Sequence, residues 1–562
     1  MTASNGLLGP QPRRVFLILT ASVVLLYGVI YPNLNLVLTS LDRAGRWSLQ
    51  NYAEALTQST VIQALINSVG LSVGTVICCG LVGVPLAFLF ERYTFPGQRM
   101  FAVIASLPLV LPPLVGTVAF VFLCGESGIL SRGVQSLLRL NGPPWTLRGW
   151  PALLLFHTYT MYPFFYVLTA AGLRRVDAGL AEAARGLGAS TPMVLGRVLL
   201  PQLTPSLIAA GLLTFMTSMA SFSAPLFFGG NVRVLTLEIF TARQRGDLSM
   251  AVTETVILAM ISLCALLFFQ RYEGTRRFVA AAMKGTPRRR RPITSGRARL
   301  LAIFCGTLFS TVLALPVLTL VLVSFARDGE WTTQTFPPTY TLANYRGLLT
   351  NSESFEVLLN SFLMSAIAAL AALVWSFCAA SLVTKGSARW WKRIVSVLIL
   401  VPWALPGTVV AVAIAEAYGK PSALLGSYIL VGTFWILPVI YFLRFMPLVV
   451  RAVQASMEQI DPSLEQAAET LGARWWQRFF RLSLPLLLPG AMAGTLLAFI
   501  IALGEYVASV LVFVPANRPI SIAIASELRD FRLGTAAAYG VVLMAVIAMS
   551  MIVATKLERS RA

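Results

Sequence analysis

Histidine is almost absent from this chain of 562 residues, which has a single one, His157, beside six cysteines. The cysteines lack the spacing of a metal or redox site, and a lone histidine is more often a packed core residue than a metal ligand. The sequence therefore predicts no metal site and no cofactor bound by the chain itself. It also argues against a membrane-embedded enzyme, which would need clustered nucleophiles, bases or metal ligands.

Charged residues are also scarce. Asp, Glu, Lys and Arg make up 12% of the chain, against about a quarter in a globular domain, and 57% is hydrophobic. The mean hydropathy is +0.76, outside the range of soluble proteins. A phosphate-binding loop is missing too, because Gly419-Lys420-Pro421-Ser422 lacks the upstream glycine that such a loop requires. We therefore expect a membrane protein that does not hydrolyse ATP itself.

Long apolar runs take the place of the missing polar residues. A bilayer span needs about 20 apolar residues. The first apolar run is longer than the hydrophobic region of a signal peptide, so we expect it to be retained as a span. Proline clusters at 108–113 and 402–406 should break the third span of each half. We predict an all-α polytopic fold with about twelve spans in two sets of six: 15–38, 63–90, 100–124, 150–172, 205–230, 250–270, 299–326, 356–384, 393–418, 424–447, 487–513 and 535–555.

The basic residues indicate the orientation of these spans. With both termini in the cytoplasm, 30 of the 44 Lys and Arg residues fall in cytoplasmic segments, as the positive-inside rule requires. That tally includes Arg444 and Arg451, which we place after the tenth span. The net charge of +21 then reflects membrane topology. Nucleic acid is not an expected partner, because no soluble basic domain is present to bind it.

The chain divides into two similar halves, residues 1–270 and 299–562, joined by a basic segment, 271–298, which we interpret as a cytoplasmic linker. Asn51-Tyr52 and Asn67-Ser68 in the first half recur as Asn344-Tyr345 and Asn360-Ser361 in the second. Six spans per half is an even number, so both halves enter the membrane from the same side. We expect parallel repeats related by an axis along the membrane normal.

One polar segment, 180–201, recurs 284 residues later as 464–485. Its Ala, Glu and Leu residues favour a helix, and Gly188 and Gly472 should end that helix in a sharp turn. We expect a second short helix after each turn that stops at Leu200-Pro201 or Leu484-Pro485. Such a loop could simply rest on the bilayer, but its duplication favours a pair of docking sites for two copies of a soluble partner.

These segments resemble the "EAA loop" of ATP-binding-cassette importer permeases, in which Glu-Ala-Ala is followed after three residues by Gly and later by Leu-Pro. In the second half Gln466 stands where the family has Glu. The residues that carry the resemblance, and that it implies couple to the ATPase, are Glu182, Ala183, Ala184, Gly188, Glu465, Gln466, Ala467, Ala468 and Gly472.

The two-half layout is similar to fused permeases of binding-protein-dependent iron(III) and thiamine importers. The resemblance implies the type I importer fold, a bacterial inner-membrane location, two cytoplasmic ATPase subunits that hold ATP and Mg, and an extracytoplasmic solute-binding protein. Its implied cargo is ferric iron; thiamine, polyamine, phosphonate and sulfate remain alternatives. A secondary transporter with parallel halves is the rival class, but it would need no duplicated docking segment.

Polar residues inside spans are costly and tend to face the interior of the bundle. Glu505, next to Tyr506, corresponds to Ser221, next to Phe222, so both halves place a polar residue at the same depth. The sequence makes these four residues and His157 candidates for the translocation pathway, although Glu505 could equally be a carboxyl group hydrogen-bonded between helices.

Overall fold

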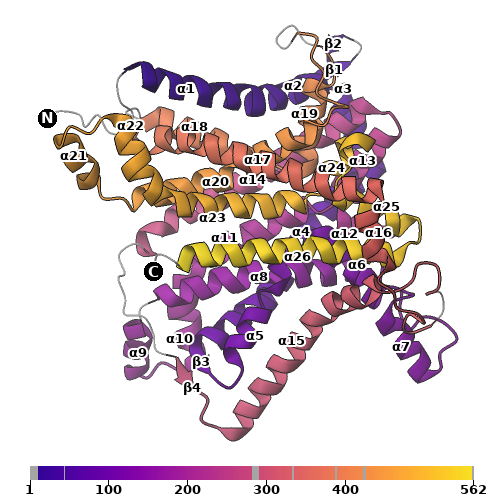
Figure 1. Cartoon of the computed structure of the whole chain (residues 1–562). Coiled ribbons are helices and arrows are strands. Elements are labelled where there is room, and N and C mark those ends of the chain that lie inside the picture. Colours follow the sequence, from indigo (N-terminus) through magenta and orange to yellow (C-terminus); the bar gives the residue numbers. More distant parts are fainter. Residues whose placement is uncertain are drawn as a thin grey trace.

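The computed structural model describes residues 11–43, 45–176, 178–280, 290–331, 334–385, 389–421 and 426–559. Its regular structure is almost entirely helical (Figure 1). The strands form two short pairs: β1 (Asp42–Arg43) is antiparallel to β2 (Arg46–Trp47), and β3 (Tyr93–Thr94) is parallel to β4 (Arg291–Pro292). The expected all-α polytopic class is confirmed.

The helices of each half follow one another in the same order. Those of the first half are α1 (Gln11–Leu25), η1 (Leu26–Ile30), α2 (Tyr31–Leu41), α3 (Gln50–Thr57), α4 (Ser59–Arg92), α5 (Gln98–Ile104), η2 (Leu107–Leu109), α6 (Pro113–Cys124), α7 (Ile129–Leu138), α8 (Gly149–Arg175), α9 (Ala178–Gly186), α10 (Thr191–Val194), η3 (Leu195–Leu199), α11 (Leu200–Met219), α12 (Ser223–Phe228), α13 (Leu235–Gln244) and α14 (Leu248–Ala280). Those of the second are α15 (Gly296–Ser324), α16 (Ala343–Thr350), α17 (Ser352–Lys385), α18 (Arg389–Ala404), α19 (Gly407–Tyr418), α20 (Ile436–Glu458), α21 (Pro462–Thr470), α22 (Trp475–Gln477), η4 (Arg478–Ser483), α23 (Leu484–Leu503), α24 (Ser509–Val512), η5 (Pro515–Asn517), α25 (Ile520–Arg529) and α26 (Leu533–Arg559).

Ten helices of the described chain are long and apolar enough to cross a membrane, and eleven segments qualify if α18 and α19 count as one bent span. The 27-residue helix α8 packs along α4 and α11 within the same bundle and occupies the place of the predicted fourth span. Helix α14 continues to Ala280, and α15 begins at Gly296, so helix extends into both ends of the predicted linker. Residues 281–289 of that linker lie outside the described residues.

Prolines interrupt the third span of each half, as the sequence predicts. In the first half α5 ends at Ile104, and a new helix, α6, begins at Pro113. In the second half α18 and α19 meet at an angle of 106°. Proline lacks the amide hydrogen that an unbroken helix needs at that position, and its ring clashes with the preceding turn. The two breaks direct the second segment of each span into the centre of the molecule.

The fourth span of the second half is placed wrongly by the sequence analysis. It begins at Ile436, as α20, and not at residue 424. Gly426 and Gly432 have φ values of +66° and +86°, so the apolar residues before Ile436 form turns. The span continues to Glu458, so that Arg444 and Arg451 lie within a helix of the bundle and not in a cytoplasmic loop.

The internal repeat extends to individual hydrogen bonds. Tyr52 lies with its hydroxyl 2.6 Å from Ser40 Oγ, and Tyr345 lies at the same distance from Ser324 Oγ. Each pair ties the short helix after the first span to the end of that span. Two other matched pairs behave alike: Asn51 and Asn344 each donate to two carbonyl groups near the end of the first span, and Ser68 and Ser361 each accept the first amide of α13 or α25.

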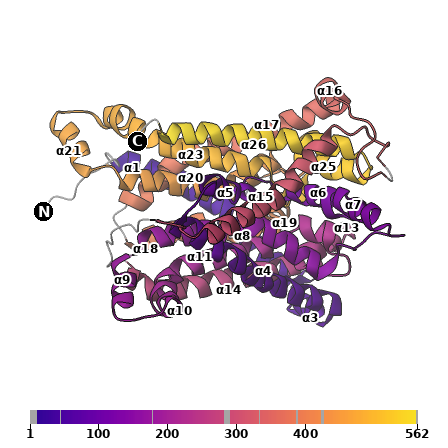
Figure 2. The ribbon, with the colours of Figure 1, turned by 90° about the horizontal axis from the view of Figure 1, so that it is seen from below.

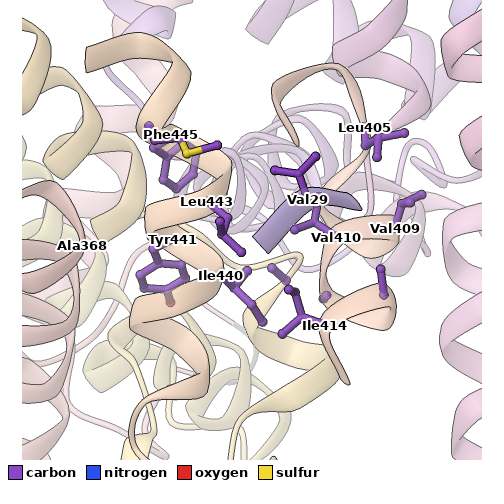
Figure 3. Close-up of a cluster of buried hydrophobic side chains, with 14 of the residues drawn as sticks. Val29, Ala368, Leu405, Val409, Val410, Ile414, Ile440, Tyr441, Leu443 and Phe445 are labelled. Carbon is purple, nitrogen blue, oxygen red and sulfur yellow. The ribbon is translucent and has the colours of Figure 1, made fainter. Parts of the chain in front are cut away.

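The first span of each half packs against the opposite half. Helix α2 lies on α19, and α15 lies on α6. The hydroxyl of Tyr418 in α19 donates to the Tyr27 carbonyl in η1, and Gly28 lies directly against Leu443 of α20. Figure 3 shows Val29 of η1 between the apolar side chains of α19 and α20. The hydrophobic core is therefore continuous across the two halves.

The polar connections lie at the two ends of this bundle. Helices α9, α10, α21 and α22 lie at the end where α1 begins and α26 finishes, and α3, α7, α13, α16 and α25 lie at the other (Figures 1 and 2). The two repeated segments are thus on one side of the protein.

Candidate coupling segments and translocation axis

The first repeated segment is a helical hairpin. Helix α9 ends at Gly186, and Gly188, with φ of +86°, turns the chain into α10. Only glycine adopts this left-handed conformation without strain. A small apolar cluster of Ala181, Val194 and Leu199 packs the two arms together. Glu182 remains on the outer surface, with 61% of its side chain exposed.

The second segment repeats this hairpin with different polar contacts. Asp461 caps α21 by accepting the Ser463 amide at 2.9 Å, and this bond holds the pKa of the carboxyl below its usual value. Gly472, with φ of +76°, makes the turn. Glu469 then lies 2.7 Å from Arg478 in the next arm, so an ion pair closes the hairpin where the first copy uses apolar contacts.

Neither hairpin ends at its Leu-Pro pair, contrary to the sequence-based expectation. Both second arms pass through a π-helical turn, η3 or η4, and continue directly into α11 or α23. Pro201 and Pro485 fall in the first turn of these long helices. Proline is tolerated there because the wider turn before it removes the need for its missing amide hydrogen. Each hairpin is therefore joined to a membrane helix without a flexible break.

The tip of each hairpin presents a leucine to solvent. Leu187 is 89% exposed and Leu471 is 87% exposed, and each directly precedes the turn glycine. Helices α9 and α21 also expose Ala183, Gln466 and Ala467. The two hairpins therefore present the same apolar side chain at their tips.

Two of the candidate pathway residues, Phe222 and Tyr506, meet where the two halves touch. Phe222 packs against Tyr506 with ring centroids 5.8 Å apart, and the two occupy the same position in their halves. Equivalent residues contact each other only on the axis that relates the halves. Phe222 is fully buried and Tyr506 is 5% exposed, so the rings close the axis in this conformation. Gly504 lets this segment approach Pro112 of the first half closely.

Glu505 is bound within the protein. Its Oε1 lies 2.8 Å from Arg444 Nη1 and accepts the Ala508 amide at 3.0 Å. The guanidinium group also lies directly against Gly407, the first residue of α19, where any larger residue would collide with it. The ion pair links α20, the break before α19 and the axis segment.

Comparisons with known proteins identify the family of this chain. Residues 83–276 and 372–562 match the family described as binding-protein-dependent transport system inner membrane component. A probable ABC transporter permease of Sinorhizobium fredii is 30% identical over 517 residues, which cover 91% of this chain and 90% of that protein. The chain belongs to the ABC importer permeases.

Further relatives differ in the cargo that their names give. A Fe(3+)-transport system permease of Haemophilus influenzae is 24% identical over 553 residues, 95% of this chain and 97% of that protein. A probable molybdenum transporter permease of Haloferax volcanii is 30% identical over 258 residues, 46% of this chain and 90% of that one. The permease is thus a fused, multi-pass inner-membrane transport subunit, and these relatives leave its cargo open.

His157 lies in a buried polar network of the first half of the permease. Its Nε2 is 2.9 Å from Ser221 Oγ, and its Nδ1 is 3.1 Å from Ser218 Oγ and 3.2 Å from Thr75 Oγ1. The ring supports Ser221 beside Phe222 and does not itself reach the axis contact. Within the described residues, no group of three or more His, Cys, Asp or Glu side chains is arranged to hold a metal ion.

Arg444, Leu187 and Leu471 are not among the site residues expected from the sequence. The misplaced fourth span assigned Arg444 to a loop, and only the position of α20 reveals that it faces Glu505. The two leucines did have a sequence signal, because a leucine precedes the glycine in both copies.

Proposed function

We propose that this permease forms the translocation pathway of an ATP-driven importer and binds one ATPase subunit at each hairpin, 180–201 and 464–485. The observation that supports this most directly is the matched pair of exposed leucines, Leu187 and Leu471, at the tips of the two hairpins. The docking surfaces in this proposal consist of, or adjoin, the residues of the two repeated motifs: Glu182, Ala183, Ala184, Gly188, Glu465, Gln466, Ala467, Ala468 and Gly472.

In this proposal the hairpin end faces the cytoplasm, where the ATPases bind ATP and Mg. The positive-inside bias supports that orientation. Closure of the ATPase pair would move the hairpins together. Because η3 and η4 continue into α11 and α23, the movement would be carried by continuous helix to Met219 and Leu503, a few residues before Phe222 and Tyr506.

The cargo that we propose is ferric iron, delivered by an extracytoplasmic solute-binding protein. Its support is the full-length relative from Haemophilus influenzae that is named for Fe(3+) transport. An oxyanion is the second candidate, favoured by the relatives named for molybdenum and 2-aminoethylphosphonate transport. The pathway residues in either case are Ser221, Phe222, Glu505 and Tyr506, with His157 behind them.

The test of this function is co-purification of the permease with its ATPase. We expect two ATPase subunits per permease. Leu187→Ala should weaken binding at its site by about thirtyfold, because a buried leucine contributes roughly 2 kcal/mol. Leu137→Ala is the matched control, since this leucine is 81% exposed at the opposite end. Unchanged ATPase binding in the Leu187→Ala, Leu471→Ala double variant would contradict the assignment.

A further inference from the structure

A cavity of about 790 Å³ opens at the end of the bundle opposite the hairpins. The first half contributes the end of α6 and the segments around α7 and α12. The second half contributes residues 326–329, Trp331 and the turn between α25 and α26. A volume of this size suits a small ligand. Because both halves supply its walls, movement of one half relative to the other would change the cavity.

The charged side chains of this cavity are mostly cationic. Four arginines line it, against the two acidic residues Glu126 and Asp328: Arg132, Arg148, Arg327 and Arg529. Asp328 is committed to the start of α26, where it accepts the Gly534 amide and the Thr535 hydroxyl, both at 2.6 Å. Its charge therefore stabilises a helix N-terminus and is not available to a cation.

Three of these arginines retain donors for a ligand. Arg148 pairs with Glu126 at 3.1 Å and Arg327 with Glu330 at 3.2 Å, yet each arginine side chain is still 67% exposed. A guanidinium group has five N–H donors, so a single ion pair leaves most of them open. Arg529, in the last turn of α25, makes no ion pair with any residue that the structure describes. The donors suit the oxygens of a carboxylate, a phosphate or a metal oxyanion.

Aromatic rings form a further part of the wall. Arg132 stacks over Trp331 with its guanidinium carbon 5.2 Å from the ring centroid. Phe531 is 80% exposed and has φ of +59°, a left-handed conformation that strains an aromatic residue. The corresponding turn of the first half has Gly246, with φ of +79°, also two residues before its helix. The second half therefore holds an aromatic side chain at the cavity where glycine would fit without strain.

The cavity adjoins the closed axis. Phe122 and Trp331 from its wall belong to the same buried cluster as Phe222 and Tyr506. A ligand in the cavity would therefore lie on the outer side of the aromatic contact between the halves.

We propose that this cavity is an outer binding site for anionic cargo, in which oxygen atoms of the ligand bind the arginines. This inference rests on the proposed import function and narrows its cargo. A bare trivalent cation would be repelled by the arginines, so ferric iron would enter as a complex with net negative charge. A free oxyanion would use the same donors.

The experiment measures equilibrium binding to the purified permease with its ATPase subunits in lipid nanodiscs. The probes are ferric citrate, citrate alone, molybdate and, as a bare trivalent cation, La³⁺. We expect saturable binding of at least one anionic probe that weakens with added salt. Arg529→Gln with Arg327→Gln should reduce that affinity at least tenfold, and the Lys variants should retain most of it. Arg346→Gln, an exposed arginine of α16 outside the cavity, should have no effect.

Binding of ferric citrate without binding of citrate or molybdate would support a chelated metal, and binding of molybdate would support a free oxyanion. The proposal is overturned if no anionic probe binds, if the Gln variants bind as the wild type does, or if La³⁺ binds the cavity more tightly than the anions. ATPase content is measured in the same samples. Loss of the ATPase pair would contradict the import function, whereas the anion measurement tests the cavity alone.

Discussion

Arg444 illustrates how one residue inside the bundle depends on its partner. Its guanidinium group forms an ion pair with Glu505 and lies against Gly407, the first residue of α19. Only 16% of the Arg444 side chain is exposed. Ion pairs in such places contribute little net stability compared with apolar residues, but loss of one partner leaves an uncompensated charge. The contact therefore matters more for holding a particular arrangement at the axis than for stability as such.

Glu505→Gln should destabilise the permease by roughly 3–5 kcal/mol, because Arg444 would remain buried without its counter-charge. The double variant Arg444→Met, Glu505→Gln should recover most of this loss. Thermal unfolding of the protein in detergent measures both effects. Glu353→Gln, on an exposed position at the start of α17, is the control. Equal losses in the single and double variants would show that the ion pair is not the cause.

Asp461 gives a prediction for pH. Its pKa is lowered by the bond from the Ser463 amide, so the carboxylate stabilises α21 at neutral pH. That stabilisation is fully present above the usual pKa of Asp and is lost as the pH falls through the lowered value. Hydrogen exchange at the first turn of α21 should therefore accelerate in acid relative to Asp461→Asn, which keeps a neutral cap and does not titrate. Parallel pH profiles of the two proteins would contradict this.

At the scale of elements, the sequence predicted what local chemistry determines. The apolar runs, the proline breaks at 108–113 and 402–406 and the turns at Gly188 and Gly472 are all present. The fourth span of the second half was misplaced because composition cannot distinguish an apolar turn from an apolar helix. Gly426 and Gly432 adopt positive φ values, and the residues around them form turns. The continuous passage through η3 and η4 was missed because a π turn has no simple sequence signal.

Gly188→Ala should impair coupling, because a Cβ at φ of +86° costs about 1–2 kcal/mol and would distort the hairpin turn. Gly186→Ala is the matched control: it lies two residues earlier, has open space around it and belongs to α9. Cargo-stimulated ATPase activity of the reconstituted complex measures the difference. If Gly186→Ala lost as much cargo-stimulated ATPase activity as Gly188→Ala, the added methyl group on the hairpin surface, and not the turn conformation, would be the cause.

For the whole molecule, the sequence predicted two parallel halves but not how they interlock. Matched residues such as Tyr52 and Tyr345 could be aligned by inspection, and their contacts are indeed equivalent. The placement of α2 on α19 and of α15 on α6 could not be predicted, since an apolar helix face fits many neighbours. The same holds for the meeting of Phe222 and Tyr506, which depends on how the halves are joined.

Removal of residues 1–41 should therefore damage the second half more than the first. This deletion uncovers α17, α19 and α20 of the second half but mainly α14 of the first, which keeps α15 against α6. Limited proteolysis of the membrane-inserted protein should show early cleavage within 389–458. A chain cut between Ala280 and Arg290 and expressed as two pieces should instead assemble, because the packed helices remain intact. Failure of the cut pieces to associate would mean that the covalent connection itself is needed.

Because the first span of each half packs against the opposite half, the protein cannot complete its packing in the order in which it is synthesised. The segment around Val29 is made and inserted early, but its neighbours on α19 and α20 leave the ribosome only after some 380 to 430 further residues. During that interval α14 of its own half packs against the first span, and lipid covers the rest of its apolar surface. The first half of this transporter therefore cannot reach its final packing before the second half is inserted. Helices α19 and α20 complete the packing around the first span.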